Sequence, residues 1–295
     1  HGLGEGHFED VTDAAGLTLR REPGHLDSRR SIFGLSTADL DGDGWTDIVA
    51  CAYGRQRNFL FKNLGDGRFR DVGMESGVAG DDDTSGVYPP ETKRFFKERY
   101  GQERQDEAPF RSNGNTFDAP VGDVDNDGDL DLFLAGITHA WAGPSSDRSS
   151  LLENLGARPT GPPLSFKRYP DAMPRTHVTP SWNQGDLYAG WTDADLDGRL
   201  DLVLASGDYP DDNRMRLFRS TGGLRYVDAT ADAGIDVSNS AMLSLADYDR
   251  DGDQDILTGN TNMRSSPETI ASRPLHPFLL ENRAAGRGAH WLSLR

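Results

Sequence analysis

The sequence repeats one nine-residue pattern four times, and this repetition constrains the fold more than any other feature. The pattern reads Asp-x-Asp-x-Asp-Gly-x-x-Asp, and a short apolar run follows its last aspartate in every copy. The four copies begin at Asp39, Asp123, Asp193 and Asp247. Their starts are 84, 70 and 54 residues apart (39 to 123, 123 to 193, 193 to 247), which indicates a unit of roughly 55 residues with insertions in the first two copies. Repeats of this size usually form one supersecondary unit each and bury their apolar faces on their neighbours.

Strand-like segments flank each copy. Runs with small residues precede the pattern, and apolar runs such as 59–63 and 278–282 follow it. Turn signals at 65–67 and 222–223 then separate further strand-like runs. The 34 glycines, the 16 prolines and an apolar content of only 35% also favour an all-β architecture. Each unit therefore offers about four short strands, which predicts a β-propeller. A linear β-solenoid is the alternative, although its repeats are usually shorter.

We expect the propeller to span residues 1–289, with four blades recognised and a total number of up to seven. The expected units cover approximately residues 31–78, 115–175, 185–235 and 240–283. Residues 8–17 match the tail of a unit, so we expect residues 1–20 to supply the end of a closing blade.

Two insertions interrupt the repeat. Residues 80–115 contain a charged stretch that predicts a short surface helix, and residues 157–185 are rich in proline. Such loops on a rigid scaffold are common recognition sites, but decoration without a function is equally compatible with the sequence.

The repeated pattern has the chemistry of a cation site. Carboxylates at positions 1, 3, 5 and 9 present hard oxygens, glycine at position 6 permits a tight turn, and the backbone carbonyl at position 7 is a further expected ligand. The expected ligands are Asp39, Asp41, Asp43, Trp45, Asp47, Asp123, Asp125, Asp127, Asp129, Asp131, Asp193, Asp195, Asp197, Arg199, Asp201, Asp247, Asp249, Asp251, Asp253 and Asp255. Because histidine and cysteine are missing from the pattern, it favours Ca²⁺ over Zn²⁺ or copper, with about one ion per loop and four in all.

Two other interpretations of the pattern are weaker. An EF-hand needs a glutamate at position 12, where this chain has Ala50, Leu134, Leu204 and Thr258. Solvated acidic turns would leave four carboxylates repelling one another in each loop unless a cation neutralised them. We therefore expect structural Ca²⁺ that fixes the connection between two strands.

Charge and hydropathy exclude several classes of protein. The net charge of −17 argues against a nucleic-acid partner. A run of 18 apolar residues is missing, so we expect no transmembrane segment. Cys51 is the single cysteine and lies in an apolar run, which predicts a buried strand residue rather than a disulfide. The chain begins with His1, from which we expect a processed or trimmed N-terminus.

The combined motifs resemble a known family. The Asp pattern followed by an aliphatic strand, and then Asn63 to Phe69, is similar to the FG-GAP/VCBS repeats of integrin-α-like β-propellers. Residues 8–17 resemble the CRTAC and ASPIC/UnbV type of secreted protein, and residues 290–295 resemble the start of an ASPIC/UnbV module, here truncated. The resemblance implies a secreted, extracellular or periplasmic protein with a role in adhesion, ligand binding or scaffolding. Seven-bladed relatives are longer than this chain, so blade number stays open.

Three classes of function follow from these observations. The first is a calcium-stabilised module for interaction with a protein partner, for example as a subunit of an extracellular assembly. The second is a carbohydrate-binding propeller, in which Trp141, Trp182, Tyr188 and Trp191 stack on sugars or simply pack in the fold. The third is an enzyme, which we do not expect, because the seven histidines show no metal-binding spacing and no nucleophile or phosphate motif occurs. A non-catalytic part of a larger extracellular enzyme remains an alternative.

Overall fold

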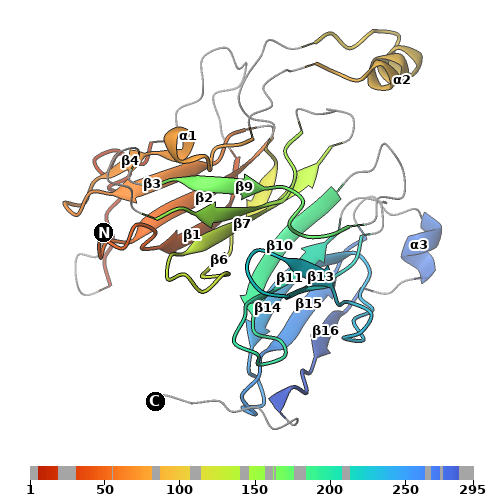
Figure 1. Ribbon diagram of the computed structural model, residues 1–295. Helices are drawn as coiled ribbons and strands as arrows, with labels where there is room; N and C mark the ends of the chain where they lie inside the picture. The colour runs from red at the N-terminus through yellow and green to blue at the C-terminus, as the bar shows by residue number, and fades with distance from the viewer. Residues whose placement is uncertain are drawn as a thin grey trace.

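The fold is all-β and propeller-like, as predicted. The computed structural model describes residues 6–18, 31–54, 56–81, 87–106, 114–139, 146–156, 162, 164–175, 184–207, 213–262, 267–272 and 275–285. Within these residues, antiparallel sheets lie side by side along a curve, and three short helices lie outside them (Figure 1). The segment 290–295, expected to begin another module, lies outside the described residues.

Each Asp pattern belongs to one antiparallel unit. Unit 1 contains β1 (Ser31–Ala38), β2 (Asp47–Tyr53), β3 (Phe59–Asn63) and β4 (Phe69–Asp71). Unit 2 contains β5 (Thr116–Asp118), β6 (Val121–Gly122), β7 (Asp131–Thr138), β8 (Ser150–Asn154) and β9 (Phe166–Tyr169). Unit 3 contains β10 (Gln184–Thr192), β11 (Asp201–Ser206), β12 (Arg216–Ser220) and β13 (Tyr226–Asp228). Unit 4 contains β14 (Ser240–Ala246), β15 (Asp255–Asn260) and β16 (Pro277–Leu280), so its described part has three strands rather than the expected four.

Units 2 and 3 form one continuous sheet, because β7 pairs with β10 at Thr138↔Gln184 and Ile137↔Gly185. The first strand of unit 2 is split into β5 and β6 around Pro120, which has no N–H group to donate to a ladder. A register shift occurs in the pairing of the first strand with the second in every unit. Such bulges increase the local twist of a strand and bend it.

The core lies between the units. Units 2 and 3 each have a neighbouring unit on both sides, and their second strands carry apolar residues on both faces. Val49 and Leu60 of unit 1 pack with Leu132 of unit 2. The opposite face of unit 2 packs on unit 3, and the far face of unit 3 packs on Leu243, Leu245 and Ile256 of unit 4. Burial of both faces explains why β7 and β11 are buried at every position.

The outer face of unit 4 differs from these interfaces. Leu279 aligns with Leu60, Leu151 and Leu217, which are 0–7% exposed, yet Leu279 is 51% exposed. Leu257 of β15, which pairs with Leu279 of β16, is 49% exposed. The total number of blades therefore stays a prediction.

The end of unit 1 docks on unit 2. After β4, helix α1 (Gly73–Ser76) ends at Gly77 in the left-handed conformation (φ +89°), where a Cβ atom would lie 3.0 Å from the carbonyl oxygen of Phe166 in unit 2. The N-terminal segment docks on unit 1 in the same way: the N–H of Phe69 donates to the carbonyl of Ala15 (2.8 Å), beside Gly16. That residues 1–20 supply the end of a closing blade stays a prediction.

Helices α2 (Pro90–Tyr100) and α3 (Pro267–Ser272) lie at the opposite ends of the strands from the Asp loops. The Asp loops connect the first strand of a unit to the second, whereas helix α2 lies between units and helix α3 lies between β15 and β16. In an antiparallel sheet, the connections that contain the Asp loops and those that contain α2 and α3 lie at opposite ends of the strands. We call these two ends of the strands the Asp-loop edge and the opposite edge. Helix α2, which projects from the sheets in Figure 1, lies in the charged stretch for which a short helix was expected. It starts with proline and ends at left-handed Gly101.

Candidate metal centre

The first three aspartates of each loop converge on one point. We call the segments Asp39–Asp47, 123–131, 193–201 and 247–255 loops 1, 2, 3 and 4. In every loop the carboxylates at positions 1, 3 and 5 offer one oxygen each within 4.8 Å of one another. The residues brought together are Asp39, Asp41 and Asp43; Asp123, Asp125 and Asp127; Asp193, Asp195 and Asp197; and Asp247, Asp249 and Asp251. These four clusters are groups that can bind a metal ion.

The aspartate at position 1 holds the turn in shape. In loop 1, Asp39 accepts hydrogen bonds from the N–H groups of Asp43 (3.0 Å) and Gly44 (2.8 Å). The equivalent pair of bonds recurs in the other three loops at 2.8–3.2 Å. The glycine at position 6 is left-handed in every loop, with φ between +86° and +102°, as its conservation of type across the four copies predicted.

Position 4 is also left-handed, which the sequence did not predict. Its residues are Gly42, Asn126, Leu196 and Arg250, with φ of 70°, 62°, 57° and 67°. These four residue types share no property that would reveal a left-handed position. Leucine and arginine are uncommon there and carry a small conformational cost, so the surrounding hydrogen bonds impose this shape.

The aspartate at position 9 lies buried beneath the other three. Asp131 is 1% exposed and accepts hydrogen bonds from the N–H groups of Val124 (3.1 Å) and Asn154 (2.7 Å). Burial raises the pKa of Asp131 to about 7, and the nearby Asp125 and Asp127 contribute to the rise. Burial likewise raises the pKa of Asp201 to about 6. Asp47 and Asp255 are equally buried and bonded in the same way.

Position 7 has a different role from the carboxylates. Its N–H group donates to the carboxylate at position 5 in all four loops, for example from Trp45 to Asp43 (2.9 Å) and from Asp129 to Asp127 (2.9 Å). The side chains at this position diverge: Arg199 pairs with Asp197, whereas Asp253 accepts a hydrogen bond from the N–H of Ala285. The role expected of the position-7 carbonyl as a metal ligand stays a prediction.

The residues fit a bound cation. The Oδ1 atoms of Asp41 and Asp125 are buried and have no hydrogen-bond partner. The pKa of Asp125 is raised by burial and by the charge of Asp127, so its ionised form is disfavoured without a positive partner. Unpartnered, mutually repelling carboxylate oxygens are the surroundings that a hard divalent cation neutralises.

The sequence did not predict that a residue at the end of the third strand lies beside each loop. The last residue of this segment donates its N–H group to the position-9 carboxylate, and the residue just before it lies beside the loop. The four residues beside the loops are Lys62, Glu153, Arg219 and Glu281. Lys62 Nζ contacts both Asp41 and Asp43 (2.8 Å to the latter). Arg219 lies 3.4 Å from Asp195. The signal was present in the sequence, because all four residues immediately precede Asn or Ser at the end of the third strand-like run.

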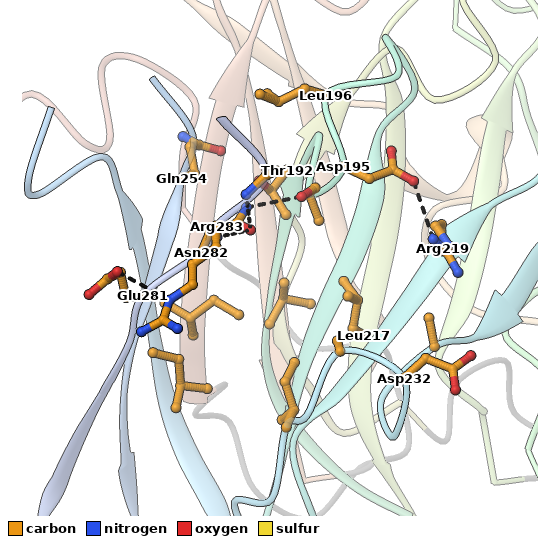
Figure 2. Close-up of a pocket in the computed structure, with 18 residues that line it drawn as sticks. Thr192, Asp195, Leu196, Leu217, Arg219, Asp232, Gln254, Glu281, Asn282 and Arg283 are labelled. Atoms are coloured by element: carbon orange, nitrogen blue, oxygen red, sulfur yellow. Dashed lines mark hydrogen bonds and ion pairs between the residues drawn. The ribbon is translucent and has the colours of Figure 1, made fainter. Parts of the chain in front are cut away.

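Asparagines connect neighbouring loops. The Asn154 side chain of unit 2 donates to the carbonyl of Leu40 in loop 1 (2.8 Å), and Asn282 of unit 4 donates to the carbonyl of Ala194 in loop 3 (2.9 Å). Figure 2 shows Asn282 beside a cavity of about 600 Å³ between units 3 and 4, with Asp195 and Arg219 paired at one side of it. Loops 1 and 3 therefore each contact the unit that follows them as well as their own.

Comparison with protein families identifies the repeat. Two segments, residues 39–89 and 193–258, match the FG-GAP-like repeat. The chain carries FG-GAP-like repeats. The matched segments contain loops 1, 3 and 4, and loop 2 shares their pattern and geometry. A search of curated proteins gives no match.

Of the four aromatic residues considered for sugar binding, Tyr188 and Trp191 lie among the described residues. Trp191 packs between units 2 and 3, with its ring centroid 6.3 Å from that of Phe133 and its Nε1–H donating to the carbonyl of Pro120 (3.3 Å). Trp191 therefore serves packing, and Tyr188 is 36% exposed. Trp141 and Trp182 lie outside the described residues.

None of the helices among the described residues is long and apolar enough to cross a membrane.

Proposed function

We propose that this chain is a calcium-binding FG-GAP-repeat module that acts outside the cell as a scaffold for a protein partner. The observation that carries the proposal is the recurrence of one oxygen cluster in four units. We further propose that it is of the integrin-like CRTAC and ASPIC/UnbV type, with the beginning of an ASPIC/UnbV module at residues 290–295, and that it is not itself an enzyme.

Calcium is the cation that suits these clusters best. All side-chain ligands offered are carboxylates, which are hard oxygen donors, and neither histidine nor cysteine lies within the loops. Mg²⁺ prefers fewer protein ligands and retains more water. We infer about four Ca²⁺ sites, one for each loop.

The role of calcium is structural in this proposal. Each loop connects the first strand of a unit to the second, and its ninth residue is the first residue of that second strand. A cation bound by positions 1, 3 and 5 would hold the loop closed above the buried carboxylate at position 9. Ion binding would thereby stabilise the strand pairing on which the interfaces between units depend.

The opposite edge of the sheets is the proposed contact surface. Helix α2 lies there, and its aromatic side chains Phe95 and Tyr100 are 55% and 63% exposed. Exposed aromatic residues on a rigid scaffold are common in protein interfaces. The Asp loops therefore maintain the scaffold, and the other edge binds the partner.

Thermal unfolding with and without calcium tests the proposal. Chelation should lower the stability of the protein by about 2.7 kcal/mol per site when free calcium had been 100 times the dissociation constant. Calcium should restore the stability, and the same concentration of magnesium should restore less. Identical unfolding curves in calcium and in chelator would contradict structural calcium.

A matched pair of variants makes the test specific. One variant replaces position 3 of every loop by asparagine (Asp41, Asp125, Asp195 and Asp249), and it should lose the response to calcium. The control replaces four exposed aspartates outside the loops by asparagine (Asp66, Asp171, Asp232 and Asp236), with the same change of charge. The control should respond to calcium as the unmodified protein does.

A further inference from the structure

The four Asp loops differ in the charge placed beside them. The differing position lies at the end of the third strand: Lys62 in unit 1, Glu153 in unit 2, Arg219 in unit 3 and Glu281 in unit 4. The residue after each of them donates its N–H to the position-9 carboxylate of its own loop at 2.7–2.8 Å. The backbone therefore places these four side chains at equivalent sites.

In loop 1 a lysine already contacts the carboxylates. The ammonium group of Lys62 touches Asp41 and lies 2.8 Å from Asp43, at positions 3 and 5, and the Lys62 side chain is only 13% exposed. An ammonium group in this place supplies positive charge to two of the three carboxylates that a metal ion would use. A calcium ion bound there would compete with this amine for Asp41 and Asp43.

In loop 3 two arginines lie beside the carboxylates at positions 3 and 5. Arg219 lies 3.4 Å from Asp195, and Arg199 pairs with Asp197. Positions 3 and 5 of this loop thus each have a guanidinium partner, as both have an ammonium partner in loop 1.

Loops 2 and 4 have the opposite charge beside them. Glu153 is held by the hydroxyl of Tyr169, which donates to its Oε2 atom (2.5 Å), and Glu281 lies at the equivalent site near loop 4. Each of these loops also has an aspartate at position 7, Asp129 or Asp253. Within the described residues, no ion pair joins a basic side chain to the position 1, 3 or 5 carboxylates of loops 2 and 4.

We propose that loops 2 and 4 bind calcium tightly, whereas Lys62 and the pair Arg199 and Arg219 act as resident cations that keep loops 1 and 3 weak. This inference rests on the proposed calcium binding and refines it. Opposite charges a few ångströms apart near a protein surface interact strongly enough to change affinity tenfold or more, and site charge is one of the properties that set calcium affinity. Two equivalents should therefore bind at least about tenfold more tightly than the rest.

Calorimetric titration of the chelator-stripped protein with Ca²⁺ counts the tight sites. The unmodified protein should show two, Lys62→Glu should show three, and Glu153→Lys should show one. Arg68→Glu is the matched control, because it makes the same change of charge as Lys62→Glu on an exposed residue that pairs with Asp66 in a hairpin outside the loops. It should leave two tight sites.

Each titration result either supports or contradicts the division of the loops into two tight and two weak sites. Four equivalent sites in the unmodified protein, or a Lys62→Glu titration equal to that of Arg68→Glu, would overturn the two-class assignment while leaving the proposed calcium binding intact. Absence of any calcium binding would overturn both. If Lys62→Glu does not fold, Lys62→Met removes the charge and keeps the length of the side chain. It should raise the affinity of one of the two weak sites about tenfold, and an unchanged titration would contradict the proposal.

Discussion

Asp186 and Asp131 are both buried carboxylates, but they differ in what balances their charge. Asp186, between units 2 and 3, is paired with Arg175 (2.6 Å) and accepts hydrogen bonds from the hydroxyls of Ser149 (2.7 Å) and Ser206 (2.5 Å). Burial alone raises the pKa of Asp186, but Arg175 and these donors hold it below its ordinary value. Asp131 receives two backbone N–H groups and faces further aspartates, and its pKa rises to about 7.

The difference separates two ways of stabilising a buried charge. At Asp186 the chain supplies the positive partner from its own sequence, so this region is complete in the folded protein. At Asp131 the neighbours are negative, so the balance depends on a cation from solution. Perturbations of the Asp186 region should therefore be independent of calcium, and perturbations of loop 2 should depend on it.

The largest effect should come from removing the internal cation. Arg175→Met leaves Asp186 buried without a positive partner, which should cost about 3–5 kcal/mol of unfolding free energy. Denaturant unfolding should show the same loss in calcium and in chelator. Arg70→Met is the control, since its guanidinium lies 3.0 Å from the exposed Glu75 and this pair should be worth less than about 1 kcal/mol. A loss that disappears in chelator would show that the two regions are not separate.

Asp125→Asn should give the next largest effect, and only with calcium present. The substitution removes one ligand of loop 2, so the variant should forgo up to about 2.7 kcal/mol of stabilisation at calcium concentrations 100 times the dissociation constant. In chelator it relieves repulsion among the loop carboxylates, and it should be neutral or slightly stabilising. Equal destabilisation in both conditions would mean that Asp125 has a role in the fold itself.

Ser206→Ala tests a single hydrogen bond to the buried Asp186 charge. Loss of a bond to a charged group should cost about 1.5–3 kcal/mol, again without dependence on calcium. Ser150→Ala is a matched comparison, because the Ser150 hydroxyl donates to the carbonyl of Arg148 and should cost about 0.5–1.5 kcal/mol. Similar losses for the two serines would show that the Asp186 charge adds nothing to the bond.

Acid should affect the Asp186 region gradually. Because its pKa is lower in the folded protein than in the unfolded chain, the stabilisation is complete above the ordinary aspartate pKa and is lost as pH falls through the folded value. One such group changes the unfolding free energy by at most about 1.4 kcal/mol per pH unit. The double variant Arg175→Met, Asp186→Asn should have a shallower acid slope than the unmodified protein. An unchanged slope would assign the acid response to other groups.

The sequence predicted the local part of this structure well. Four identical patterns indicated the loops, and the apolar runs behind Asp47 and Asp131 indicated that each loop leads into a strand, as it does. Local turn chemistry explains this success, because glycine and aspartate act within nine residues. The expected ligand set and the identity of the ion stay predictions, although positions 1, 3 and 5 do converge.

The parts that could not be predicted depend on contacts between distant residues. Arg175 and Asp186 lie in a proline-rich insertion and at the start of a strand, and nothing in their spacing indicates that they pair. The contact of Lys62 with Asp41 depends on the pairing of β2 with β3, which brings residues 21 positions apart together. The left-handed Leu196 and Arg250 are set by the hydrogen bonds around them rather than by their own preferences.

The asparagine bonds between loops have a mechanical consequence. Asn154 joins unit 2 to loop 1 and Asn282 joins unit 4 to loop 3, but the equivalent residue of unit 3 is Ser220, whose shorter side chain donates no such bond to loop 2. At that junction the loop edge has instead an exposed 3.4 Å bond from Asn126 to Gly198, while β7 and β10 are paired at the other edge. A bending force on the arc is therefore expected to open the Asp-loop edge first between units 2 and 3, with the β7–β10 pairing as the axis of an elastic hinge.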